Sequence, residues 1–109
     1  MISEIKILSD KEIEIKLKEL PGWVREGNKI TKGFELENFL KVIMFINNLA
    51  PIFEEIEHHP DMHISYKKIR FELTRHDIGG KITEKDFSVA AEIEQQLILF
   101  QKGAKLNII

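Results

Sequence analysis

Three of the four histidines in this chain lie in two short segments whose residue types suit acid–base chemistry. His58 and His59 follow a run of glutamates, and His76 opens a polar segment that extends to Asp86. Histidine titrates near neutral pH, so one imidazole can donate a proton while another accepts one. Two or more imidazoles in one pocket would therefore suit a reaction that moves one proton onto a substrate and another off it.

The first of these segments is predicted at the C-terminal end of a long helix, over about residues 37–57. The helix is supported by apolar residues at helical spacing, namely Phe39, Val42, Ile43, Ile46, Leu49 and Phe53. Pro51 should kink this helix or divide it in two, because proline removes a hydrogen bond and clashes one turn back. Pro60 disfavours helical backbone at the residue before it, so the helix should end near His58.

The N-terminal part of the chain predicts a helix followed by a hairpin. Ser9 and Glu12 form a capping box for the helix, which Pro21-Gly22 should stop. The hairpin strands are expected at residues 23–25 and 29–36, around a turn that contains Gly27.

The C-terminal half predicts two more strands and a final helix. The strands are expected at residues 62–66 and 69–75, with Lys67-Lys68 a poor turn between them. A loop covers residues 76–80, and Thr83 should cap a helix over about residues 84–102 that Gly103 ends. The order α-β-β-α-β-β-α predicts an α+β fold, in which three helices cover one face of a four-stranded antiparallel sheet.

Composition narrows the class of protein. The 109 residues fit a single domain, and a net charge of −2 with interspersed signs gives no sign of a nucleic-acid partner. The absence of cysteine excludes disulfides, thiol catalysis and thiolate metal sites. No segment is long and apolar enough to span a membrane, so we expect a cytoplasmic protein without a membrane partner.

The predicted elements also orient the candidate residues. A histidine at the C-terminal end of a helix lies near carbonyls with partial negative charge, which favours the protonated form of His58. Glu54, one turn earlier on the same helix, can reach His58 and strengthen that effect. His59 should point elsewhere because it precedes Pro60, and His76 should lie at the far end of a strand, away from the core.

Structural roles could account for several of these residues taken singly. The pair His58-His59 could be a polar end to its helix. Asp86, three residues after Thr83, fits a helix-capping position without any further role. Trp23, beside Pro21-Gly22, is more often a core anchor than part of a ligand site.

A metal site is a sharper alternative, because three histidines and a carboxylate can bind zinc. The spacing argues against it. Pro60 lies between His59 and His63 and prevents the helical arrangement that would bring these two imidazoles together, while adjacent residues such as His58 and His59 diverge. Acid–base chemistry without a metal is the preferred interpretation.

The last predicted helix is apolar on more than one side. Residues 97–100 are four apolar residues in a row, and they lie beside stripes that include Phe87 and Ile93. One side can serve the core, and the surplus predicts a subunit interface and therefore a homo-oligomer. The alternative is a helix sunk deeply in its own core.

Taken together, these motifs resemble the signature of the pterin-4a-carbinolamine dehydratase family. The matching motifs are Glu54-x-x-x-His58-His59-Pro60, Tyr66, His76-Asp77-x-Gly79-Gly80-x-x-Thr83-x-x-Asp86, Leu20-Pro21-Gly22-Trp23 and the region of Phe34 and Phe39. The resemblance spans about residues 9–100. It implies the α+β fold predicted above, assembly into dimers or tetramers, and dehydration of a 4a-hydroxytetrahydropterin to the quinonoid dihydropterin, without a metal or organic cofactor.

The resemblance also implies residue roles. His58, His59 and His76 would be catalytic, with His59 helping to place the substrate. Substrate binding would fall to Glu54, Pro60, Arg75, Asp77, Ile78, Asp86 and Trp23.

A second function is implied by animal relatives, which also act as a dimerisation cofactor for a transcription factor through a helical surface. On that alternative the chain is an interaction module that uses its apolar last helix.

Overall fold

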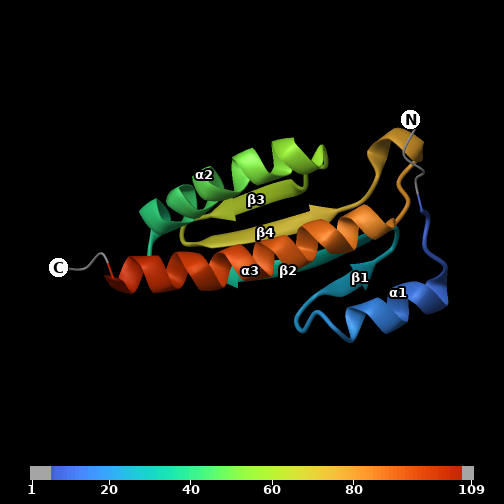
Figure 1. The fold of residues 1–109 in the computed structure, drawn as a ribbon, viewed down its shortest axis with the longest axis horizontal. Helices are drawn as coiled ribbons and strands as arrows, with labels where there is room; N and C mark the ends of the chain where they lie inside the picture. The colour runs from blue at the N-terminus through green and yellow to red at the C-terminus, as the bar shows by residue number, and fades with distance from the viewer. Residues whose placement is uncertain (1–5, 107–109) are drawn as a thin grey trace.

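A four-stranded antiparallel sheet carries the fold, and three helices pack against one of its faces (Figure 1). The computed structural model describes residues 6–106, in which the strand order is β1-β2-β4-β3. The helices are α1 (Asp10–Leu17), α2 (Phe39–Ile56) and α3 (Glu84–Leu106), with a short 3-10 helix, η1, at His76–Ile78. The strands are β1 (Val24–Glu26), β2 (Lys29–Glu35), β3 (Asp61–Ser65) and β4 (Lys68–Leu73). The predicted α+β class and element order are confirmed.

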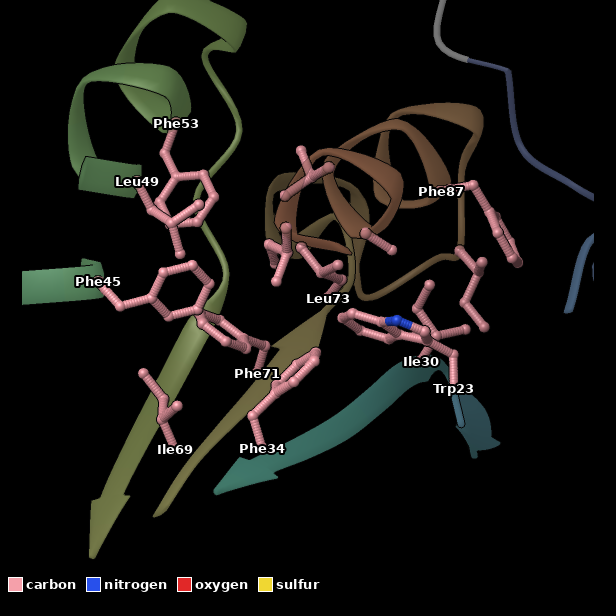
Figure 2. Close-up of a cluster of buried hydrophobic side chains, with 14 of the residues drawn as sticks. Trp23, Ile30, Phe34, Phe45, Leu49, Phe53, Ile69, Phe71, Leu73 and Phe87 are labelled. Atoms are coloured by element: carbon pink, nitrogen blue, oxygen red, sulfur yellow. The ribbon is translucent and has the colours of Figure 1, made fainter. Parts of the chain in front are cut away.

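The core lies between the sheet and the helices. Alternate side chains of β4 point into it, as do Ile30 and Phe34 of the neighbouring strand β2. Figure 2 shows Phe71 beside Phe45 of α2, with Leu49 and Phe53 of the same helix above them, whereas Ile30 lies beside Trp23. Because each large apolar side chain contributes about 1.5–3 kcal/mol on burial, this layer holds α2 firmly over the sheet.

The opposite face of the sheet has a charged cluster around Glu72 of β4. Its buried carboxylate accepts a hydrogen bond from Nζ of Lys29 at 2.9 Å and lies 3.0 Å from Nη2 of Arg70. The hydrogen bond from Lys29 is the main reason that the pKa of Glu72 lies below its ordinary value. Glu72 is therefore ionised, and the positive charges of Lys29 and Arg70 compensate its negative charge.

The first helix begins as predicted and ends early. The capping box of Ser9 and Glu12 is present, with both reciprocal hydrogen bonds formed. The helix ends at Leu17, before Pro21-Gly22, and the next three residues tighten into turns whose N–H groups bond to carbonyls three residues back.

Helix α2 is one continuous helix, so of the two alternatives predicted for Pro51, a kink or a division, the division is wrong. Pro51 lies on the exposed side, where the carbonyl that lacks a donor one turn earlier can meet water. Asn38 caps the helix by accepting a hydrogen bond from the N–H of Lys41 at 2.9 Å. The predicted apolar stripe was partly wrong as well. Phe39 begins the helix and is exposed, whereas Phe45 is fully buried.

Two further boundaries differ from the prediction. Helix α3 continues through Gly103 to Leu106, which a single glycine permits at a cost of about 1 kcal/mol. The turn between β3 and β4 is Tyr66-Lys67, because Ser65 pairs with Lys68, and Tyr66 has a positive φ of 56°. None of the helices in the described part of the chain is long and apolar enough to cross a membrane.

Candidate active site

A hollow of about 290 Å³ lies between the C-terminal end of α2 and the segment that follows β4. Residues 57–59, at the end of α2, line one side of the hollow, and residues 74–77, after β4, line the other. Figure 1 shows the end of α2 and the segment with η1 at the same end of the sheet. The structure thus brings His58, His59 and His76 to one concave surface, at the lower end of the size range of small-molecule sites.

The way α2 ends decides where the histidines point. Glu57 adopts the left-handed conformation (φ 60°, ψ 40°), and its N–H bonds to the carbonyl of Glu54. The N–H of His58 then bonds to the carbonyl of Phe53 at 3.2 Å, which completes a Schellman motif. The chain turns sharply here, so His58 is buried and its neighbour His59 is exposed.

His58 is paired with the carboxylate of Asp86 from the first turn of α3. Its Nε2 lies 2.5 Å from Oδ1 of Asp86, and both side chains are buried. The second oxygen, Oδ2, accepts hydrogen bonds from the backbone N–H of Thr83 at 2.7 Å and from its hydroxyl at 3.1 Å. In this pair the carboxylate oxygen is the acceptor, which makes Nε2 of His58 the donor. Asp86 therefore caps α3 and orients His58 at the same time.

The other two imidazoles are also held through Nε2. His59 bonds to the carboxylate of Glu54, and His76 bonds to Oδ2 of Asp61 at 2.9 Å. The predicted contact of Glu54 with His58 is wrong. Residues four apart share a face only while the helix continues, and α2 ends at Ile56, between the two.

Arg75 and Asp77 form a fixed ion pair on the wall of the hollow. Nε and Nη2 of Arg75 donate to the two carboxylate oxygens of Asp77 at 2.9 and 2.7 Å. These hydrogen bonds hold the pKa of Asp77 below its ordinary value and raise the pKa of Arg75. Both groups therefore stay charged through the neutral pH range, so the charges on this wall of the hollow do not change there.

The structure places the other predicted site residues outside the hollow. Pro60 is buried directly after His59, and Ile78 is half-buried in η1, but neither lines the surface. Trp23 does not line it either. Figure 2 shows its indole in the core beside Ile30, and Nε1 donates to the carboxylate of Glu94 at 2.8 Å. The prediction that Trp23 lines the pocket is therefore wrong for the hollow of this chain. Trp23 is a core anchor, which was the alternative predicted from the sequence.

Sequence reasoning missed three residues at the site. Glu57 and Thr74 line the hollow, and Asp61 bonds to His76 from outside it. Asp61 directly follows Pro60, so its position beside the histidine motif was a usable signal. Within residues 6–106, no group of three or more His, Cys, Asp or Glu side chains is placed to hold a metal ion.

Comparison with known proteins identifies the family. The model of the pterin 4 alpha carbinolamine dehydratase family matches residues 6–96, which include every residue of the hollow. The chain belongs to this family. Two relatives named as pterin-4-alpha-carbinolamine dehydratases illustrate the match. A protein of Roseiflexus sp. (strain RS-1) is 47% identical over 81% of this chain and 94% of its own length. A protein of Sulfolobus acidocaldarius is 40% identical over 81% of this chain and 96% of its own length.

Solved structures agree with the family fold. A transcriptional coactivator/pterin dehydratase from Brucella melitensis superposes with a TM-score of 0.77 at 26% identity, over 84% of this chain and 98% of its own. A pterin dehydratase-like protein described as a RuBisCO assembly factor of the alpha-carboxysome gives a TM-score of 0.57 at 20% identity, which shows a shared fold alone.

Gly80, in the segment between η1 and α3 of this dehydratase-family chain, donates a backbone hydrogen bond to the carbonyl of Arg75 and allows a testable prediction about the loop that follows the hollow. It has a positive φ of 77°, and a Cβ there would overlap Nδ2 of Asn28 in the first hairpin turn. We expect Gly80→Ala to lower the free energy of unfolding by about 1–2 kcal/mol, measured by chemical denaturation.

Gly79 is the matched control, because it has a similar φ of 81° and nothing within 4 Å of its Cβ position. Gly79→Ala should show the backbone cost alone, and an Asn28→Ala background should remove the excess cost of Gly80→Ala. A larger loss from Gly79→Ala than from Gly80→Ala would contradict this interpretation.

Proposed function

We propose that this chain is a 4a-hydroxytetrahydropterin dehydratase that acts by histidine acid–base catalysis, in the recycling of tetrahydrobiopterin. The observation that carries the proposal is the hollow in which His58, His59 and His76 meet, within a chain of the dehydratase family. Each of these imidazoles has its own carboxylate partner. A cytoplasmic location stays a prediction.

The reaction requires two proton movements. The lone pair of the ring nitrogen next to C4a forms a C=N bond while the C4a–O bond breaks. The departing hydroxyl takes a proton from an acid and leaves as water, and the nitrogen loses its own proton to a base. We assign these two steps to His58 and His76, one acting as the acid and the other as the base, with His59 placing the substrate. Positioned acid–base groups typically contribute about 10²–10⁴-fold.

The wall of the hollow suits the rest of a pterin. The ring edge of a pterin presents both N–H donors and carbonyl or ring-nitrogen acceptors. The carboxylate of Asp77 can accept from such donors, and the guanidinium of Arg75 can donate to such acceptors. Their mutual ion pair fixes both groups before a ligand arrives, which lowers the cost of ordering them on binding.

The test is a stopped-flow assay in which an aromatic amino-acid hydroxylase generates the 4a-hydroxytetrahydropterin. We expect the chain to accelerate formation of the quinonoid dihydropterin in proportion to its concentration. A rate equal to that of the uncatalysed reaction, with a folded protein, would overturn the proposed function.

We also propose that the chain forms a homo-oligomer through the outer surface of its helices. Ile98 and Leu99 of α3 are 56% and 51% exposed, and Leu40 and Met44 of α2 are exposed as well. Large apolar residues exposed on the outer sides of helices are typical of subunit interfaces. The same surface would serve the alternative function, a partner-binding module.

Leu99→Lys tests this surface. We expect the molar mass of the variant, measured by size-exclusion chromatography with light scattering, to fall towards that of the monomer, because a charge is costly in an apolar interface. Ser88→Lys, which places the same charge at an exposed position of the same helix, should leave the mass unchanged. A wild-type chain that is already a monomer would refute the homo-oligomer and favour the partner-binding module.

A further inference from the structure

His76 is the most exposed of the three histidines of the hollow and has the least support of its own. Its side chain is 67% exposed, and it stands at the start of η1, a helix of three residues followed by Gly79 and Gly80. His58 is fixed by burial, whereas an exposed imidazole on a short segment can adopt several rotamers. A group that acts on a substrate must be held close to its working geometry, so His76 needs an anchor.

Asp61 supplies that contact from the sheet. Its Oδ2 lies 2.9 Å from Nε2 of His76, across 15 residues of sequence. Asp61 is the first residue of β3 and pairs with Glu72 of β4, and the residue before it is the buried Pro60. The backbone that carries this carboxylate is therefore fixed by the sheet on one side and by a proline ring on the other.

The surrounding charges leave Asp61 available to His76. Glu72, which is paired with Asp61 across the two strands, already has Lys29, Arg70 and His63 as partners. Among the ion pairs of residues 6–106, the partner of Asp61 is His76. The Asp61 carboxylate is itself 51% exposed, so its use is in orientation more than in stability.

The contact also selects a nitrogen. A carboxylate that accepts from Nε2–H keeps the proton there and leaves Nδ1 as the nitrogen that can exchange a proton with a ligand. The same arrangement holds His58 through Asp86 and His59 through Glu54. All three imidazoles of the hollow are thus held at Nε2.

We propose that Asp61 is a positioning residue of the active site, which holds the His76 imidazole by Nε2 so that Nδ1 serves the reaction. This inference rests on the proposed dehydratase function and adds to it a residue outside the lining of the hollow. Asp61 acts through His76 and does not contact the substrate.

The experiment compares Asp61→Ala, Asp61→Asn and Asp61→Glu in the full chain. We expect kcat to fall about 10–100-fold in the alanine and asparagine variants, with KM within about twofold, and to recover in part with glutamate. Glu35→Gln is the matched control, because it removes an exposed, ion-paired carboxylate from strand β2 of the same sheet. It should change neither constant.

Nitrogen-15 NMR of the imidazoles provides a readout that is independent of turnover. Asp61→Ala should change the tautomer-sensitive nitrogen shifts of His76 and leave those of His58 unchanged. An active wild type together with an unimpaired Asp61→Ala, or unchanged His76 shifts, would overturn the positioning role alone. An inactive wild type would instead overturn the dehydratase proposal, and the NMR shifts would then decide the Asp61–His76 pairing by themselves.

Discussion

Asp86→Asn is expected to lower kcat by about 10²–10⁴-fold while the protein stays folded. The wild-type carboxylate accepts from Nε2–H of His58 through Oδ1 and from Thr83 through Oδ2. Asparagine has one oxygen and one NH₂ group. The oxygen can keep the bond to Thr83, and the NH₂ group then faces His58 and requires an acceptor there. The proton of His58 would move to Nδ1, which inverts the tautomer that the proposed mechanism uses.

Asp86→Ala separates this effect from the structural role of the same residue. It removes the acceptor for the N–H of Thr83 at the start of α3 and leaves the buried imidazole of His58 without its partner. The expected loss is about 2–4 kcal/mol of unfolding free energy, measured by chemical denaturation, in addition to the loss of activity.

The control for both variants is Glu84→Gln. Glu84 lies in the first turn of the same helix and pairs with Lys16, away from the hollow. It should leave kcat unchanged. If Asp86→Asn and Glu84→Gln had the same kcat as the wild type, the orientation of His58 by Asp86 would play no part in the reaction.

His58→Ala and His76→Ala form the second large prediction. Each variant should lower kcat/KM by about 10²–10⁴-fold in the stopped-flow assay, because each removes one of the two proposed proton-transfer groups. Their effects on stability should differ. His58 is buried against Asp86, so its loss should also lower the free energy of unfolding, whereas His76 is exposed and its loss should not.

His63→Ala is the control for these two substitutions. His63 lies in β3, is about half exposed, and does not line the hollow. Its removal should leave turnover as it is in the wild type. Wild-type rates in both His58→Ala and His76→Ala would refute the assignment of acid–base roles to these residues.

The fold could be predicted from the sequence because its signals are local. The capping box at Ser9, the alternation along β4 and the proline after His59 each act over a few residues and do not depend on the rest of the chain. Boundaries were less secure. Leu17 ends α1 early and Gly103 does not end α3, because packing and hydrogen bonding of neighbouring turns outweigh single-residue preferences.

The pairing of side chains in the site could be predicted only in part. Asp86 had two alternatives, a cap or a functional residue, and the structure gives it contacts of both kinds. The predicted contact of Glu54 with His58 is not formed, because the left-handed residue Glu57 turns the chain. His59 therefore contacts Glu54, and His58 contacts Asp86. Asp61 could not be found from periodicity, since its partner His76 is brought to it by the hairpin of β3 and β4.

The central claim is that three imidazoles from two distant segments act on one bound pterin, and imidazole NMR tests it most directly. The chain has four histidines, so a sample with nitrogen-15 histidine can report on each of them during titration with a 7,8-dihydropterin. We predict that the signals of His58, His59 and His76 shift together with one saturation curve, while that of His63 stays in place. Saturating dihydropterin that leaves His58 and His76 unchanged, or that shifts His63 alone, would contradict the claim.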